Sequence, residues 1–286
     1  MKKILAASAS LMMLAGAAQA QTAAPAAPAP EWTVAGNVSL NSDYRFRGFT
    51  QTNYGAALQG GIDITHSSGF YVGNWNSNVA QDLYNGASLE MDFYGGFKGE
   101  VAPGLGYDVG AIYYYYPQSG VDRDTASNYV NKKINNQELY LGLSYGPLSA
   151  KLYYATGDYF KTSYLASTNA TALESTKGTT YLDLSYTQEV NGLILGAHYG
   201  LLTLKKYDQT GTPGLFMSGD TTPGTPAPLT KTVSDYKLSI GKDIGAGYIL
   251  TGAFVTTSKK GYFATDLGAA KAAGKSAVVV TVAKTF

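Results

Sequence analysis

The sequence predicts an all-β fold, a transmembrane antiparallel up-and-down β-barrel of about 12 strands. Three observations support this prediction. Apolar and polar residues alternate with a period of two through most of the chain, which is typical of strands with one apolar face. The composition of 24 Tyr, 34 Gly and only 14% charged residues suits strands whose tyrosines sit between apolar and wet surroundings. The predicted connections alternate between short and long, as in outer-membrane barrels, which have short periplasmic turns and longer extracellular loops.

The N-terminal region is predicted to be a leader followed by a linker. Lys2 and Lys3 precede an apolar run that ends at Ala18-Gln19-Ala20, so residues 1–20 have the form of a cleaved secretory signal peptide. The run is shorter than the roughly 20 residues of a spanning helix. Residues 21–31 are rich in Ala and Pro and are predicted to be a flexible periplasmic linker. The barrel is therefore expected over residues 32–286.

Each predicted strand follows from alternation within its own range. Between residues 56 and 65, for example, Leu58 and Ile62 fall on one face and Asp63 on the other. The other strands are expected at about 33–48, 70–79, 89–98, 105–116, 137–145, 148–158, 179–189, 193–204, 234–243 and 248–257, with a twelfth running to the C-terminus. Short turns are expected near 66–69, 99–104, 146–147, 190–192 and 244–247, and longer loops near 80–88, 117–135, 159–178, 205–233 and 258–275. An even number of strands returns the C-terminus to the side of the linker.

Alternation alone is also compatible with a soluble β-sandwich, whose apolar face would be a core. The alternating loop lengths, the leader combined with a terminal Phe286, and tyrosines at strand ends favour the barrel. Closure of the sheet would also satisfy every backbone group in lipid.

The stretch from Asn37 to Gln51 is read as part of the first strand, with Arg45 and Arg47 near the outer mouth of a pore. The polar faces supply the candidate pore-lining residues Asp43, Arg45, Arg47, Asp63, Glu90, Asp92, Asp108, Glu138, Lys151, Asp183, His198 and Lys237. The apolar faces supply the candidate membrane girdle Tyr44, Phe46, Tyr71, Trp75, Phe93 and Phe286. Opposed charges across a narrow pore would orient dipolar solutes and filter ions. Charges that pair with one another and fill the lumen are the open alternative.

Composition disfavours several other functions. The leader removes two basic residues and no acidic one from the 21 basic and 20 acidic residues, so the mature chain carries a net charge of minus one. A nucleic-acid partner is not expected without a basic stripe. The chain has no Cys and hence no disulfide or thiolate chemistry. No metal site or cofactor is expected, because Asp122 and Asp124 lie in a predicted loop without a spaced ligand set.

Several segments resemble a known family. SDYRFRGFTQ at 42–51, QGGIDITHSSGFYVGNWNSNV at 59–79, LEMDFYGGF at 89–97 and YYYYP at 113–117 are similar to TorF-type porins, which are Gram-negative outer-membrane proteins. The resemblance implies a barrel with a pore and brings no catalytic residues. Phe286, after alternating valines, resembles the C-terminal signal read by the barrel-assembly machinery, although Lys284 departs from that pattern.

These observations predict a channel in the Gram-negative outer membrane for passive diffusion of small hydrophilic solutes or ions. The expected partners are membrane lipid, the assembly machinery and the solutes. The alternatives are a receptor or adhesion barrel that acts through its surface loops, a structural barrel with a plugged lumen and, with less support, a lipid hydrolase. No catalytic residue is predicted, because neither His66 nor His198 has an identifiable serine neighbour at lipid depth.

Overall fold

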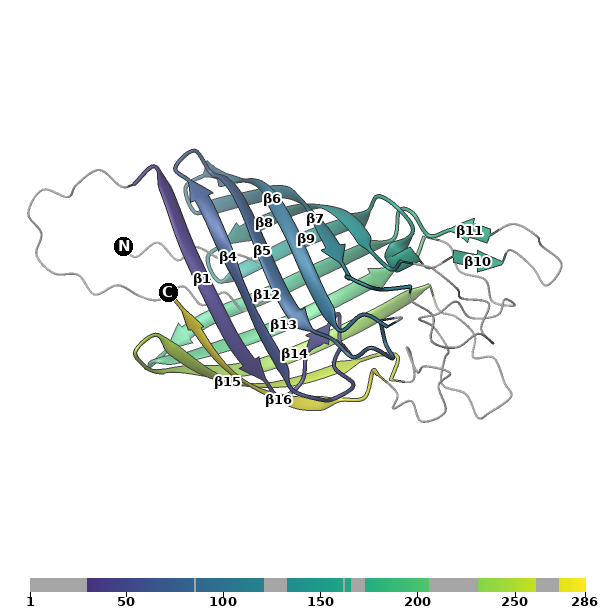
Figure 1. Cartoon of the computed structure of the whole chain (residues 1–286). Helices are drawn as coiled ribbons and strands as arrows, with labels where there is room; N and C mark the ends of the chain where they lie inside the picture. The colour runs from purple at the N-terminus through teal and green to yellow at the C-terminus, as the bar shows by residue number, and fades with distance from the viewer. Residues whose placement is uncertain are drawn as a thin grey trace, which may run out of the picture.

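The protein is a closed barrel of twelve antiparallel strands (Figure 1). The computed structural model describes residues 30–84, 86–120, 133–161, 163–165, 173–205, 231–260 and 273–286. The barrel strands are β1 (Trp32–Asn41), β4 (Ala57–His66), β5 (Phe70–Asn78), β6 (Leu89–Ala102), β7 (Leu105–Tyr115), β8 (Asn136–Tyr145), β9 (Leu148–Ala155), β12 (Thr180–Val190), β13 (Leu193–Thr203), β14 (Thr232–Gly245), β15 (Tyr248–Thr257) and β16 (Ala277–Thr285). Consecutive barrel strands pair with one another, and β1 closes the sheet by pairing with both β4 and β16.

The predicted barrel of about twelve strands is confirmed, and most predicted boundaries lie within a few residues of the observed ones. The prediction for the first strand, residues 33–48, is wrong beyond Asn41, where β1 ends. The predicted signal peptide lies outside the described residues, as does most of the predicted linker. Among the described residues, no helix is long and apolar enough to cross a membrane.

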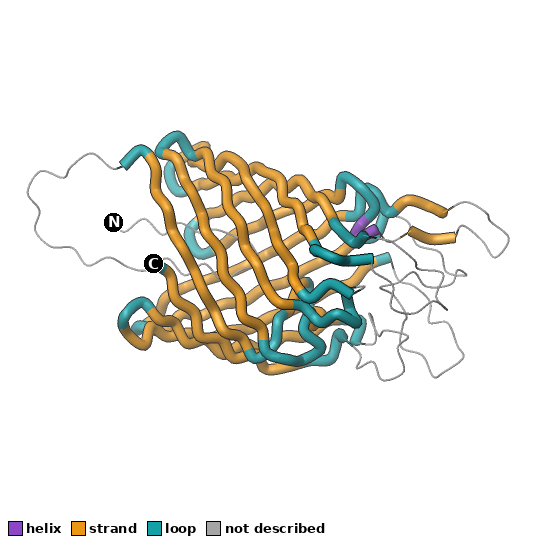
Figure 2. The backbone as a smooth tube through the Cα atoms, in the orientation of Figure 1, coloured by secondary structure: helices purple, strands orange, loops and turns teal. Residues whose placement is uncertain are grey.

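The two ends of the barrel differ in their connections (Figure 2). At one end, which we call the short-turn end, tight turns join β4 to β5, β6 to β7, β8 to β9, β12 to β13 and β14 to β15. Asn191 and Gly192 form one of these turns with φ values of 53° and 74°, the two positive values that a two-residue type I′ hairpin requires. The opposite end carries the longer connections and is called the long-loop end.

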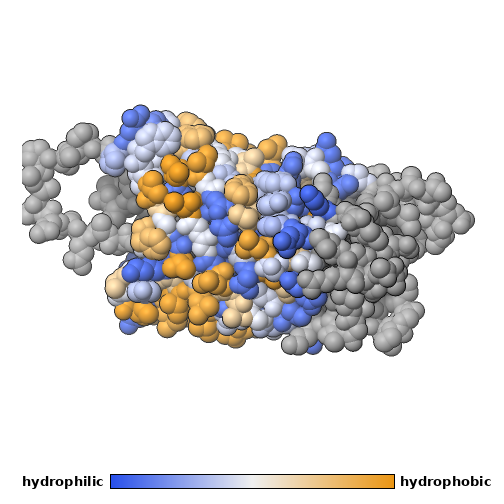
Figure 3. Space-filling model, viewed as in Figure 1, coloured by the Kyte–Doolittle hydropathy of each residue, from blue (hydrophilic) through white to orange (hydrophobic). Residues whose placement is uncertain are grey.

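The outer surface of the barrel carries many apolar side chains, which Figure 3 shows on one face with hydrophilic residues between them. Outward side chains such as Leu58, Leu141 and Leu238 are more than half exposed. Exposed outward aromatics lie near both ends of the strands. Those toward the short turns are Trp32, Phe70, Phe97, Tyr145, Tyr186, Tyr248 and Phe286, and those toward the long loops include Tyr154, Tyr236 and Phe254.

The C-terminal residue helps to close the barrel. The backbone N–H of Gly36 donates to the carbonyl oxygen of Phe286 at 2.7 Å, and the N–H of Phe286 donates back to Gly36 at 2.9 Å. The Phe286 ring covers Gly36 so closely that a Cβ at this position would lie 2.6 Å from the ring. A residue without a side chain is therefore needed on β1 to seat the terminal aromatic ring.

The interior of the barrel is filled unevenly along its axis. Near the long-loop end, inward side chains such as Trp75, Tyr116 and Tyr181 are buried in two aromatic clusters. Toward the short-turn end, inward side chains such as Thr65 and Ser144 remain partly exposed. The lumen is thus more open on the short-turn side and occupied on the long-loop side.

Candidate pore constriction

Residues 42–56 leave β1 at the long-loop end and fold into the lumen instead of continuing the strand. We call this segment the inner hairpin. It contains the short paired strands β2 (Arg45–Phe46) and β3 (Phe49–Thr50), joined by Arg47 and Gly48 at the tip. The tip residues have φ values of 49° and 85°, the pattern of a type I′ turn. Because the tip contacts β8, β9 and β12, on the opposite side of the strand order from β1, the inner hairpin crosses the lumen.

The tip of the inner hairpin is held by an ion pair with the far wall. The Arg47 Nη1 and Nη2 atoms donate to the two carboxylate oxygens of Glu138 at 3.0 and 2.7 Å. Nη1 also donates to the Tyr159 hydroxyl at 2.8 Å. Both charged side chains are at most 3% exposed. Because water hardly reaches the pair, removing either partner would leave a buried charge without a counter-ion.

Aromatic rings surround the same guanidinium. Its carbon lies 4.3 Å from the ring centre of Tyr181, 4.7 Å from that of Phe46, and 5.4 and 5.5 Å from those of Tyr159 and Tyr153. Burial raises the pKa of Tyr159 to about 12 although Arg47 acts in the opposite direction, so the phenol stays neutral and its oxygen accepts a hydrogen bond from the guanidinium. The Arg47 Nε atom is buried and has no hydrogen-bond partner among the residues that the structure describes.

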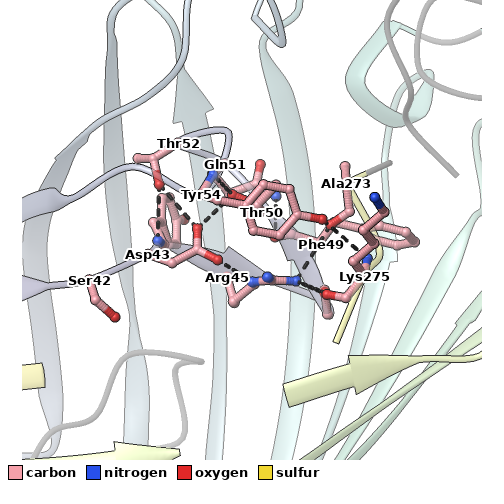
Figure 4. A network of polar contacts seen from close by, with 12 residues as sticks. Ser42, Asp43, Arg45, Phe49, Thr50, Gln51, Thr52, Tyr54, Ala273 and Lys275 are labelled. Carbon is pink, nitrogen blue, oxygen red and sulfur yellow. Dashed lines mark hydrogen bonds and ion pairs between the residues drawn. The ribbon is translucent and has the colours of Figure 1, made fainter. Parts of the chain in front are cut away.

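The base of the inner hairpin is held by a separate polar network (Figure 4). The Asp43 carboxylate accepts from Arg45 Nε at 2.5 Å and from the Thr50 hydroxyl at 2.6 Å. Arg45 also donates to the carbonyl oxygen of Lys275 at 2.9 Å, and the Thr50 N–H donates to that of Ala273 at 3.0 Å. These contacts join the base to the segment that precedes β16, far from Glu138.

A second set of carboxylates lies beside the inner hairpin on β6. The Glu90 carboxylate accepts from the hydroxyls of Tyr44 at 2.7 Å and Tyr116 at 2.9 Å. Asp92 is also buried, and its Oδ1 atom has no hydrogen-bond partner. The edge of the Trp75 ring packs against Tyr44 at 5.4 Å. The inner hairpin therefore lies against an acidic wall.

Toward the middle of the barrel the charges pair between adjacent strands or across one intervening strand. Lys151 Nζ donates to Asp108 at 2.6 Å, and the same carboxylate accepts from the Tyr71 hydroxyl at 2.5 Å. His198 lies between two carboxylates, with Nε2 2.9 Å from Asp235 and Nδ1 3.3 Å from Asp183. These pairs satisfy part of the interior charge without joining opposite walls.

The twelve candidate pore-lining residues all lie inside the barrel, but in two different settings. Asp43, Arg45 and Arg47 belong to the inner hairpin, where Arg45 holds the base and Arg47 the tip. The other nine project inward from the strands; they are Asp63, Glu90, Asp92, Asp108, Glu138, Lys151, Asp183, His198 and Lys237. Their role in lining a conducting pore stays a prediction.

Four of the six predicted girdle residues are wrongly assigned to the membrane surface. Tyr44 and Phe46 belong to the inner hairpin and lie within the lumen. Tyr71 and Trp75 project inward from β5, because Trp75 is in register with Asp92 of β6 and partners in register share a face. Phe93 and Phe286 are outward and exposed. On β5 the aromatic face is thus the lumen face, and Asn74 and Asn76 lie on the outside.

Sequence reasoning missed four residues that complete the interior networks: Asp235, Tyr153, Tyr159 and Tyr181. Asp235 lies two positions before Lys237 on the same face of β14, so the period of two could have identified it. The same spacing places Tyr153 two positions after Lys151 on β9 and Tyr181 two positions before Asp183 on β12, whereas Tyr159 lies beyond the end of β9, where alternation assigns no face.

The contacts of His198 do not form a nucleophilic centre. The Ser185 hydroxyl lies 3.3 Å from Nδ1, but it donates to Asp183 at the shorter distance of 2.6 Å. With carboxylates facing both ring nitrogens, the imidazole is arranged to donate from both and has no lone pair left for a hydroxyl proton. Within the described residues, no group of three or more acidic, His or Cys side chains could hold a metal ion.

Comparison with solved structures gives the same fold. The chain is similar to the NanC porin with a TM-score of 0.50 and 6% identity over 89% of this chain and 99% of that one. The KdgM porin gives 0.48 and 7% over 88% and 98%, and OccAB3 of Acinetobacter baumannii gives 0.39 and 12% over 91% and 65%. At such low identity the likeness to the NanC porin supports the fold alone.

Comparison of the sequence with other proteins identifies a family without an assigned function. No curated protein matches the chain. A family model does match, over residues 24–211, which include the inner hairpin, the residues around the Arg47 guanidinium and strands β1 to β13. The TorF-type assignment stays a prediction. The chain belongs to the family described as "Bacterial protein of unknown function (Gcw_chp)".

Proposed function

We propose that the protein is an outer-membrane channel for passive diffusion of small hydrophilic solutes or ions, constricted at its long-loop end by the inner hairpin. The observation that carries this proposal is the inner hairpin itself, which crosses the lumen and is fixed at its tip through Arg47 and Glu138. Side chains of the strands alone could fill the interior of a barrel that only needs to be stable. A separate segment held to the wall at both its base and its tip therefore favours a role in restricting the lumen. The apolar exterior with aromatics near both ends supports insertion in a bilayer.

The charges of the lumen favour cations over anions. The inward carboxylates are Asp43, Asp63, Glu90, Asp92, Asp108, Glu138, Asp183 and Asp235, and the inward cations are Arg45, Arg47, Lys98, Lys151 and Lys237 together with His198. Toward the short-turn end the same inward faces also carry Glu100, Glu189 and Asp243, which are exposed and form no ion pair among the described residues. An excess of negative charge in a low-dielectric channel raises the local cation concentration.

The proposal also includes the location and the assembly partner of the protein. The leader would direct export, membrane lipid would surround the apolar surface, and Phe286 would be presented to the barrel-assembly machinery. With this orientation the short-turn end faces the periplasm and the inner hairpin restricts entry from outside.

The test is planar-bilayer conductance of the refolded protein and of a variant that lacks residues 45–50. We expect a cation-selective current in the wild-type protein and a several-fold larger single-channel conductance in the variant, because the lumen is then no longer crossed. The absence of current in both folded proteins would refute the channel.

A receptor or adhesion barrel with a plugged lumen is the second candidate. It is favoured by the tight packing of Trp75, Tyr116 and Tyr181 within the long-loop half. Residues 213–228, in a predicted long loop outside the described residues, can be deleted to separate the two functions. Loss of a surface ligand in this deletion variant, together with the absence of current in the wild-type protein, would support the receptor.

A further inference from the structure

The pocket that holds the Arg47 guanidinium is built almost entirely by the barrel wall. Glu138 comes from β8, Tyr153 from β9, Tyr181 from β12 and Tyr159 from η1 (Tyr159–Lys161), the short helical turn that follows β9. We call these four residues the cage. The inner hairpin adds only Phe46 to it. The recognition surface therefore belongs to the wall, and Arg47 is a side chain inserted into it.

The chemistry of the cage matches a guanidinium group in particular. The two Glu138 oxygens accept from two different nitrogens at 3.0 and 2.7 Å, a parallel pair of hydrogen bonds that a planar guanidinium makes and an ammonium does not. The rings of Tyr153, Tyr159 and Tyr181 lie within 5.5 Å of the guanidinium carbon, where their faces attract a cation. Burial of these residues removes the competition of water.

The cage does not depend on Arg47 for its shape. Tyr153 and Tyr181 are direct cross-strand partners of β9 and β12, and Tyr153 also pairs with Tyr140 of β8, so the sheet fixes their spacing. The Tyr114 hydroxyl donates to Glu138 at 3.2 Å and orients the carboxylate independently of the inner hairpin. Removing the Arg47 side chain would leave a cavity with the Glu138 carboxylate and the tyrosine rings in place.

The inner hairpin would also remain attached without its tip contact. Asp43, Arg45 and Thr50 hold its base to the segment before β16. The tip itself is an unfavourable place for arginine, because the first central position of a type I′ turn prefers Asn, Asp or Gly. An unfavourable backbone residue retained at such a point indicates that its side chain has a function beyond folding.

We propose that the cage is a binding site for guanidinium-bearing solutes and that Arg47 is its tethered competitor. A solute that enters the cage displaces the tip and widens the lumen, so binding of the solute opens the channel to it. Arg47 fits incompletely, because its buried Nε donor is unpaired, and this weakens the tethered group relative to a free one. The gating part rests on the proposed channel function, whereas the binding site itself does not.

Binding is tested by isothermal titration of guanidinium chloride, at low millimolar non-denaturing concentrations, and of L-arginine into refolded protein in detergent. The Arg47→Ala variant should bind both at least tenfold more tightly than the wild-type protein, in which the tethered group competes at millimolar or higher effective concentration. Arg45→Ala is the matched control, because it removes a guanidinium from the same hairpin but leaves the cage occupied. The double variant Arg47→Ala/Glu138→Gln should lose the binding.

Each other result contradicts part of the proposal. Equal affinity of Arg47→Ala and Arg45→Ala, or no binding to folded Arg47→Ala, would overturn the site, and equal binding of tetramethylammonium would overturn its guanidinium specificity. A variant lacking residues 46–49 replaces Arg47→Ala if the latter does not refold. Binding without current in the bilayer would refute the channel and retain the site. Current without binding would support the channel and refute the site.

Discussion

Glu138→Gln should release the tip of the inner hairpin while leaving nearly the same volume in the cage. The neutral amide keeps one acceptor for Arg47 but removes the opposite charge, so a guanidinium that is at most 3% exposed is left without a counter-ion. Removing one partner of a buried ion pair costs about 3–5 kcal/mol, which corresponds to a change on the order of 10²–10⁴ in the ratio of docked to released hairpin. The tip should therefore spend much more time away from the cage.

The assay combines single-channel recording with urea unfolding of the detergent-refolded barrel. We expect a higher open probability for Glu138→Gln and a loss of about 3–5 kcal/mol in the free energy of unfolding. The variant Arg47→Met/Glu138→Gln should lose less than the sum of the two single changes, because no unpaired charge stays buried. Glu100→Gln, at an exposed position near the short-turn end, is the control and should resemble the wild type.

Two results would refute this reasoning. If Glu138→Gln matches the wild type in both current and stability, the ion pair does not hold the hairpin. If the two single changes add fully in the double variant, Arg47 and Glu138 do not act on one another.

Three further predictions use other contacts of the barrel. Gly200→Ala would bring a Cβ to 2.1 Å from the Tyr181 hydroxyl and should lower the free energy of unfolding by about 1–3 kcal/mol. The control Gly252→Ala, whose Cβ would have no atom within 4 Å, should lower it by less than about 1 kcal/mol. Equal losses in the two variants would contradict the close packing at Gly200. Gly36→Val should displace the Phe286 ring and slow refolding into the heat-modifiable form seen by gel electrophoresis, and refolding at the wild-type rate would contradict the role of this contact. Lys151→Met should remove the partner of Asp108 and shift the reversal potential toward stronger cation selectivity, while the exposed Lys242→Met should not.

Sequence reasoning predicted the wall of the barrel well because the wall obeys one local rule. Alternation with a period of two is imposed at each strand by lipid on one side and water or polar groups on the other. The twelve strands and their turns follow from it. The rule identifies the two faces but not which one is the lumen, and for β5 the aromatic face was assigned to the wrong side. On β5, Tyr71 and Trp75 point inward because they hydrogen-bond to and pack against residues that are distant in sequence. The alternation of polar and apolar residues along one strand carries no information about such contacts.

The alternation of polar and apolar residues did not predict the inner hairpin, for a physical reason. A strand and a hairpin that folds back on itself both alternate, so residues 42–48 read as a continuation of β1. The usual hairpin signal is Asn-Gly or Asp-Gly at the tip, and here Arg47-Gly48 replaces it because the tip residue also has to reach Glu138.

One signal of the inner hairpin was nevertheless available in the sequence. The strand predicted at residues 33–48 is longer than the roughly 9 to 11 residues that span a bilayer, whereas β1 itself has 10. The excess begins at Ser42-Asp43, and Asp43 is the carboxylate that anchors the base. The excess length therefore indicated that this strand ends before residue 48.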